Sequence, residues 1–275
     1  MNRFLSNVLA LTALASAVLC TPAMAQTTVW GVQSSTGKIL KIDPLTGAVL
    51  GSFATPAPIA AAADHVGLTI AEGGTSLLYI NTDVSTNLYR LNPNTGAILS
   101  TVFGDNFQNH GLSYEKIGGS DFIYYSHLSS DTHRQSGFGG TTTFFWGPGA
   151  PTGGLGGDGN GREFGIYSDG LIHEFNPSVN QTTFLSTLPE PSAGLEGLAF
   201  DGTFLYASNS AGQLFTLNPN TGAVLHTVTV GGGTLVELGA AVTGSTGVPE
   251  PGALGLCTGL AVTSLFVVIR RIRRR

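Results

Sequence analysis

The histidines of the central part of the chain are the first candidates for chemistry, because that part contains no cysteine. The two cysteines, Cys20 and Cys257, lie near the two ends of the sequence. Cysteine catalysis and disulfide bonds are therefore excluded from residues 26–247. Zinc requires three or four converging ligands. His127 and His133 flank Asp131, but nothing in their spacing indicates convergence. We therefore predict no metal site, no cofactor and no catalytic constellation.

Glycine-rich runs occupy residues 137–140 and 153–161. No Gly-Lys-Ser/Thr sequence follows them, and no strand-to-helix pattern surrounds them, so they do not fit a nucleotide site. Asp158 and Asn160 could begin a calcium loop, but no carboxylate follows at the required spacing. We expect Asp158 to stabilise a turn and the residues around it to form a mobile surface loop.

Three polar residues occupy comparable places in the sequence. His65, His110 and Glu196 each stand one or two residues before a Gly-Leu pair. If each pair begins an equivalent strand, the three side chains would surround the same opening and form a ligand-binding site. Polar residues in solvated loops are the alternative explanation.

Aromatic residues next to the first glycine-rich run are a second candidate site. Phe144, Phe145 and Trp146 are consecutive. Exposed rings of this kind could stack against sugars, whereas buried rings would form part of a strand in the core. The sequence leaves both possibilities open.

The composition indicates how these residues are positioned. The chain has 275 residues with 39 Gly and 13 Pro, and only 11% of its residues are charged. This content of turn formers favours many short strands over a helical bundle. Residues 26–247 hold six Lys and Arg against 16 Asp and Glu, a net charge of −10. So acidic a segment is a poor nucleic-acid binder.

A repeated hairpin runs through this central segment. Four similar stretches begin at Ile42, Leu91, Phe175 and Leu217, and in each the third residue is Pro, preceded by Asn or Asp. A strand runs in, the polar residue and Pro set the turn, Gly takes a positive φ in three of the four, and a second strand runs out. A second hairpin precedes it in several repeats, which gives four strands per unit.

Four short strands in about 40–45 residues are typical of a β-propeller blade. We therefore predict an all-β fold, a β-propeller of four or five blades, and favour five. The count depends on residues 129–162, which hold either a degenerate blade or a glycine-rich insertion. The first repeat lacks one strand, and residues 235–242 could supply it and close the ring. An open β-sandwich or a solenoid is the structural alternative. The hairpins resemble those of YVTN-type and quinoprotein-like propellers, a resemblance that implies the fold and no activity.

The N-terminus has the features of a signal peptide. Arg3 provides a positive charge, residues 4–19 are apolar or small, and Ala23 and Ala25 occupy the positions read by signal peptidase. We expect cleavage after Ala25, so that residues 1–25 are removed and the protein is exported.

The C-terminus, residues 248–275, combines three features. Pro249, Glu250 and Pro251 come first, and residues 252–269 then carry no charge. That length approaches the ~20 residues of a transmembrane helix. A basic cluster follows, which would stay on the cytoplasmic side of the inner membrane; it consists of Arg270, Arg271, Arg273, Arg274 and Arg275.

This order resembles the PEP-CTERM sorting signal. The resemblance covers residues 248–275 and implies an exported protein that is anchored transiently in the inner membrane. It further implies that an exosortase-type enzyme recognises Pro249-Glu250-Pro251 and removes the tail, and that the protein functions with exopolysaccharide or in a biofilm. The two prolines disfavour helix before the span, which would keep the motif extended and accessible.

Three functions remain open at this point. The first is a non-catalytic surface or matrix protein, located in the periplasm and then at the cell surface, that binds a polysaccharide or another surface protein. The second is an exported propeller enzyme, such as a lyase, glycosidase or lactonase, which would need paired carboxylates or a calcium ion. An assembly factor that keeps its anchor is a third possibility.

Overall fold

The computed structural model describes an all-β domain. Its described residues are 27–56, 66–81, 85–104, 109–127, 131–146, 151, 153–159, 161–176, 184–188, 194–231 and 233–240. The predicted signal peptide and the predicted sorting signal lie outside these ranges. Within them, no helix has the length and apolar character that crossing a bilayer requires.

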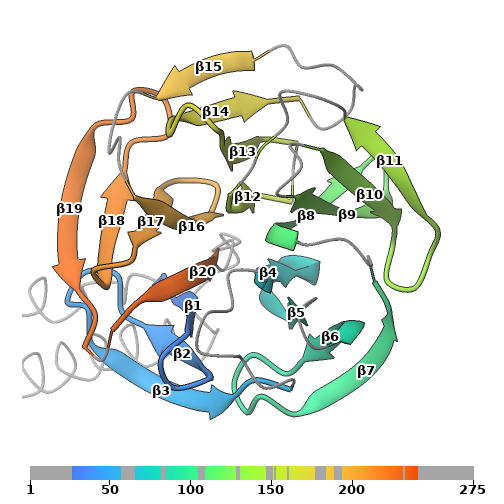
Figure 1. The fold of residues 1–275 in the computed structure, drawn as a ribbon, viewed down its shortest axis with the longest axis horizontal. Helices are drawn as coiled ribbons and strands as arrows, with labels where there is room; N and C mark the ends of the chain where they lie inside the picture. The colour runs from blue at the N-terminus through green and yellow to red at the C-terminus, as the bar shows by residue number, and fades with distance from the viewer. Residues whose placement is uncertain are drawn as a thin grey trace, which may run out of the picture. The chain divides into compact units, whose positions relative to one another are not determined.

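Five four-stranded antiparallel sheets are arranged as blades around a centre, which makes the domain a five-bladed β-propeller (Figure 1). From the centre outward, blade 1 is β20 (Leu235–Ala240), β1 (Val29–Gln33), β2 (Lys38–Ile42) and β3 (Val49–Ala54). Blade 2 is β4 (Val66–Ala71), β5 (Ser76–Asn81), β6 (Ser85–Leu91) and β7 (Ile98–Phe103). Blade 3 is β8 (Asn109–Ile117), β9 (Ser120–His127), β10 (Thr132–Ser136) and β11 (Thr142–Trp146). Blade 4 is β12 (Leu155–Gly157), β13 (Glu163–Ile166), β14 (Ile172–Phe175) and β15 (Phe184–Leu188). Blade 5 is β16 (Leu195–Phe200), β17 (Leu205–Asn209), β18 (Gln213–Leu217) and β19 (Val224–Thr229).

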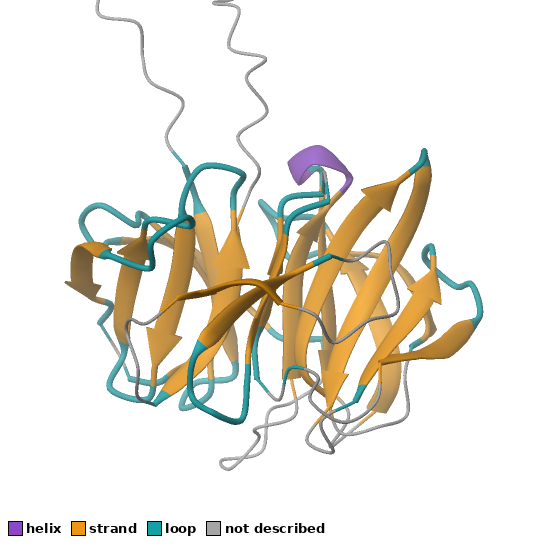
Figure 2. Cartoon of the chain, turned by 90° about the horizontal axis from the view of Figure 1, so that it is seen from above, coloured by secondary structure: helices purple, strands orange, loops and turns teal. Residues whose placement is uncertain are grey.

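Blade 1 closes the ring with strands from both ends of the domain. β20 pairs antiparallel with β1, with Val29 opposite Ala240 and Gly31 opposite Leu238. The prediction that residues near 235–242 supply the missing strand is confirmed. Closure gives the innermost strand of blade 1 a hydrogen-bonded partner, and it excludes an open sandwich or solenoid. Figure 2 shows the ring from the side, with loops on both of its faces.

The disputed residues 129–162 supply strands of two blades. They contain β10 and β11, the outer half of blade 3, and β12, the innermost strand of blade 4. This settles the blade number at the favoured five, and the glycine-rich insertion that the sequence left as the alternative is not present among the described residues. Leu155 and Gly156 are buried, so residues 155–157 form a strand at the centre of the molecule where a mobile loop was expected.

The repeated turn has the predicted geometry. In blade 2, the amide of Gly96 donates to the carbonyl of Asn92 at 2.8 Å, and the side chain of Asn92 accepts from the amide of Asn94 at 2.9 Å. Gly96 has a φ of 71°, which a residue with a Cβ adopts only at a cost. The turns of Asp43 and Asn218 have the same backbone bond, to Gly47 and Gly222.

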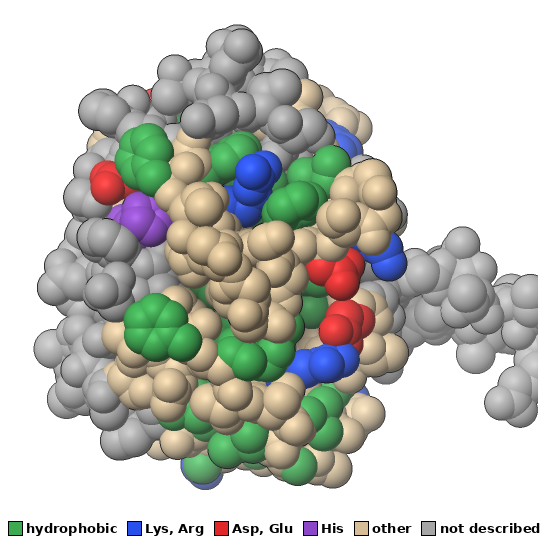
Figure 3. All heavy atoms as spheres, turned by 90° about the vertical axis from the view of Figure 1, so that its right-hand side faces the viewer, with side chains coloured by type: hydrophobic (Ala, Val, Ile, Leu, Met, Phe, Trp, Pro, Cys, Tyr) green, Lys and Arg blue, Asp and Glu red, His purple; other side chains and the backbone are tan. Residues whose placement is uncertain are grey.

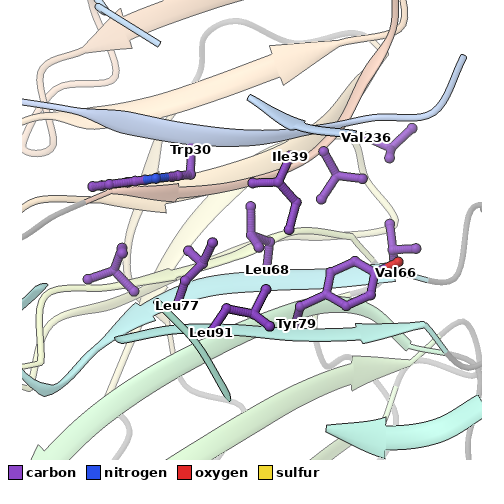
Figure 4. Close-up of a cluster of buried hydrophobic side chains, with 10 residues drawn as sticks. Trp30, Ile39, Val66, Leu68, Leu77, Tyr79, Leu91 and Val236 are labelled. Atoms are coloured by element: carbon purple, nitrogen blue, oxygen red, sulfur yellow. The ribbon is translucent and has the colours of Figure 1, made fainter. Parts of the chain in front are cut away.

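The hydrophobic core lies between neighbouring blades. In one cluster, Trp30 and Ile39 of blade 1 pack against Leu68 and Tyr79 of blade 2 (Figure 4). The indole Nε1 of Trp30 also donates to the carbonyl of Pro93 at 3.0 Å. Each blade is thus held by apolar burial on the next, which replaces the disulfide bonds that the segment lacks.

A ring of glycines lets the innermost strands approach one another. A Cβ on Gly67, Gly111, Gly154, Gly197 or Gly239 would lie 2.5–3.1 Å from an atom of the next innermost strand. The order of contacts is cyclic, from β4 to β8, β12, β16, β20 and back to β4. At these positions the centre of the propeller has no room for side chains.

Candidate functional site

Two of the three residues predicted to share an opening lie at the start of innermost strands. His110 on β8 and Glu196 on β16 are both partly buried, and each directly precedes a glycine of the central ring. Between them, the amide of Gly154 donates to the carbonyl of Glu196 at 3.2 Å. The two side chains therefore belong to the same end of the ring. His65 lies outside the described residues.

Glu237 is a further carboxyl group near this end, and the sequence analysis did not single it out. It is 1% exposed on β20, and burial raises its pKa well above the usual value, with a smaller contribution from the negative charge of Glu196. It stands in the sequence Leu-Val-Glu-Leu-Gly, where it follows the alternation of a half-exposed strand. β20 is buried along its whole length, and β16 packs closely against the backbone of Glu237.

A second buried carboxyl cluster lies between blades 3 and 4. Glu115 on β8 and Glu163 on β13 are fully buried, and Asp158 is 8% exposed beside them. The amides of Gly159 and Gly161 donate to Glu115 at 3.2 and 2.7 Å. Burial first, and then the charge of Asp158, raises the pKa of Glu115 to about 8. Burial and the nearby Glu115 raise the pKa of Glu163 as well.

The raised pKa values favour the protonated forms of Glu115 and Glu163. A Cβ on Gly157 would clash with the carboxyl oxygens of both glutamates, so the backbone of β12 covers them. A sugar ring could not reach carboxyl groups that are covered in this way. Asp158 also accepts from the amide of Arg162 at 3.2 Å, which is the turn chemistry expected for it.

A third cluster contradicts the expectation that the histidines do not converge. One ligand atom from each of His127, Asp131 and His133 lies within 4.8 Å of the other two. His127 is 1% exposed and His133 is 7% exposed, and their ring centroids are 4.2 Å apart. The sequence-based expectation was wrong because the register of the β9–β10 hairpin, which spacing alone does not give, places the three residues on one face.

The aromatic residues of β11 separate into two environments. Phe144 is 58% exposed, and its ring centroid is 5.9 Å from that of His133. Phe145 is 3% exposed and packs against Tyr124 and the guanidinium of Arg134. Phe145 is thus a core residue, and Phe144 offers an exposed ring. The side chain of Trp146 lies outside the described part.

The remaining described histidines, His173 and His226, contact other parts of the propeller scaffold. His173 lies 2.8 Å from the carboxylate of Asp169. His226 is exposed on β19, and its Nε2 is 2.8 Å from the carbonyl oxygen of Leu45. The first contact lies within one hairpin, whereas the second joins blade 5 to blade 1.

Comparison with known proteins adds little to this geometry. No family model matches the chain, and no curated protein matches it. Among solved structures, BamB from Moraxella catarrhalis is similar at 19% identity with a TM-score of 0.38. The match covers 76% of this chain and 63% of that one, so the chain spans less than two thirds of the length of BamB. The fold assignment therefore depends on the five sheets described above.

Proposed function

We propose that this protein is exported, anchored briefly in the inner membrane and then released by an exosortase-type enzyme to work at the cell surface or in the extracellular matrix. The observation that carries the proposal is the order of features in residues 248–275: the Pro249-Glu250-Pro251 motif, an uncharged stretch and a terminal arginine cluster. Signal peptidase would first cleave after Ala25. The anchored form would face the periplasm.

We further propose that the propeller is a non-catalytic binding module for exopolysaccharide or a surface protein. Glu115 and Glu163 are covered by backbone, and so they are suited to holding protons and not to contacting a polymer. On one side of the domain, a few charged groups are scattered among hydrophobic side chains and uncharged other atoms (Figure 3). Such a surface suits contact with a neutral or weakly charged partner through groups such as Phe144.

A propeller enzyme acting on a polysaccharide or a lactone is the second candidate. The observation that favours it is that the charge of Glu196 helps to raise the pKa of the buried Glu237, because glycosidases use two carboxyl groups in different protonation states. In such an enzyme the substrate would contact the partly buried Glu196, since Glu237 is only 1% exposed. An enzyme of this kind would lose its activity in both Glu196→Gln and Glu237→Gln. A non-catalytic binding module would show no turnover of these substrates in the parent or in either variant.

The intact mass of the protein in membrane and extracellular fractions of its host tests the sorting proposal. We expect a secreted form that begins at Gln26 and ends within residues 248–251. Changing Pro249, Glu250 and Pro251 together to Ala should move the protein into the membrane fraction with its tail retained. The reason is that recognition, and not membrane insertion, would be lost.

A matched control replaces Arg274 and Arg275 by Lys, which keeps the positive charge of the tail. This variant should be processed like the parent if charge alone holds the tail in the cytoplasm. A parent protein that keeps its arginine tail in every fraction would contradict the sorting proposal and leave a permanently anchored propeller.

A further inference from the structure

We propose that His127, Asp131 and His133 form a binding site for a divalent transition-metal ion, of which zinc is the best match. The proposal concerns the chemistry of blade 3 and does not depend on the proposed function. Two imidazoles and one carboxylate are a donor set that zinc, and also iron or copper, accepts in proteins.

The register of the hairpin brings the three side chains together. In the β9–β10 pair, Ser126 lies opposite Thr132 and Tyr125 lies opposite His133. The next pair in this register is His127 and Asp131, and the amide of His127 donates to the carbonyl of Asp131 at 3.0 Å. Directly opposed residues share a face of the sheet, and so do residues two apart on one strand. All three side chains therefore lie on the same face.

The distances fit a site that closes around an ion. Tetrahedral zinc with bonds of about 2.0–2.1 Å holds its donor atoms about 3.3 Å apart. The three donor atoms lie within 4.8 Å of one another, so small rotations of the side chains would bring them to that spacing. His127 and His133 belong to paired strands, and strands position ligands more accurately than loops do.

The burial of the cluster leaves one direction open. The two histidines are buried, whereas Asp131 is partly exposed. Three protein ligands would leave the fourth position of zinc to water or to an oxygen donor of a bound molecule. Phe144, exposed and next to His133, would then provide an apolar surface beside that position. His127 is also the cross-strand partner of Asn109, directly before His110, so the site belongs to the same end of the ring as His110.

Metal binding by the full-length protein in detergent tests the proposal. Protein stripped with EDTA should take up one equivalent of Zn²⁺ per chain in a competition titration against a chromophoric chelator. Its Tm should rise with added Zn²⁺, because an ion that binds only the folded state stabilises it. Co²⁺ in place of Zn²⁺ should give the visible absorption of a tetrahedral or five-coordinate site.

Two variants and one control decide the assignment. Asp131→Asn, at a partly exposed position, and His133→Gln should each weaken Zn²⁺ binding at least tenfold and abolish the Co²⁺ absorption. His226→Gln removes an exposed histidine from blade 5 and should bind as the parent does. If His133→Gln fails to fold, Asp131→Asn still tests the site. Parent protein that binds no stoichiometric Zn²⁺, or an Asp131→Asn variant that binds it as tightly as the parent, would overturn the proposal.

Discussion

Replacing Gly154 by Ala should lower the free energy of unfolding by about 3 kcal/mol, at the upper end of the cost of overpacking a well-packed interior. For a domain of this size, that loss corresponds to a fall in Tm of about 10 °C. A Cβ at Gly154 would lie 2.5 Å from the amide nitrogen of Leu198 and 2.9 Å from the carbonyl carbon of Gly197. Both atoms belong to the backbone of β16, so no side chain can rotate away. Blades 4 and 5 would have to separate.

Gly231→Ala is the matched control. A Cβ at Gly231 would have nothing within 4 Å, and its φ is not in the left-handed region. This variant should unfold at the Tm of the parent or slightly above it, since Ala restricts the unfolded chain. Thermal unfolding of both variants, followed by circular dichroism, makes the comparison. Equal Tm values for Gly154→Ala and the parent would show that the innermost strands are not packed as described.

The stability of the domain should fall as the pH rises from 5 to 8. Glu115 has a pKa of about 8 in the folded protein against 4.5 as its reference, and the pKa values of Glu163 and Glu237 are also raised. Between those limits the folded chain binds more protons than the unfolded chain. The free energy of unfolding then decreases by up to about 1.4 kcal/mol per pH unit for each such proton. We expect a loss of about 2 kcal/mol or more over this interval, measured by urea unfolding at each pH.

Glu163→Gln tests the origin of this slope. The amide keeps the shape of the protonated carboxyl group and cannot ionise, so the variant should be more stable than the parent at pH 8 and should show a shallower dependence on pH. Glu174→Gln is the control, because Glu174 is not one of the three clustered carboxyl groups and pairs with the guanidinium of Arg162 at 2.7 Å. It should lose a similar amount of stability at pH 5 and pH 8. A parent whose stability is constant from pH 5 to 8 would contradict the assignment.

The hairpins and the closure of the ring could be predicted from the sequence because their causes are local. The polar residue, Pro and Gly of each turn determine the backbone over a few residues, as the bonds from Asn92 to Gly96 and Asn94 show. The missing strand of blade 1 followed from counting, since a blade needs four strands and residues 235–240 had the right alternation. The comparable places of His110 and Glu196 followed from the same alignment.

The environment of a strand was harder to predict. Residues 153–157 have the composition of a loop. They nevertheless form the innermost strand β12 and the two residues that lead into it, at the centre of the propeller. Glycine favours a loop when only local conformational freedom is considered. Here glycine is required because the backbone of β16, more than 40 positions later in the chain, packs directly against Gly154. The exposed Phe144 and the buried Phe145 likewise differ only by the face of β11 on which they lie.

The sequence by itself therefore determined the strand content, the turns and, to within one, the number of blades, because each depends on motifs formed by residues that are neighbours in the chain. Only the tertiary structure decided which groups meet. The pairing register of β9 and β10 joins His127, Asp131 and His133, and the packing of blade 3 on blade 4 buries Glu115 beside Glu163. Register and blade packing depend on contacts between distant segments, and the spacing of residues in the sequence does not contain them.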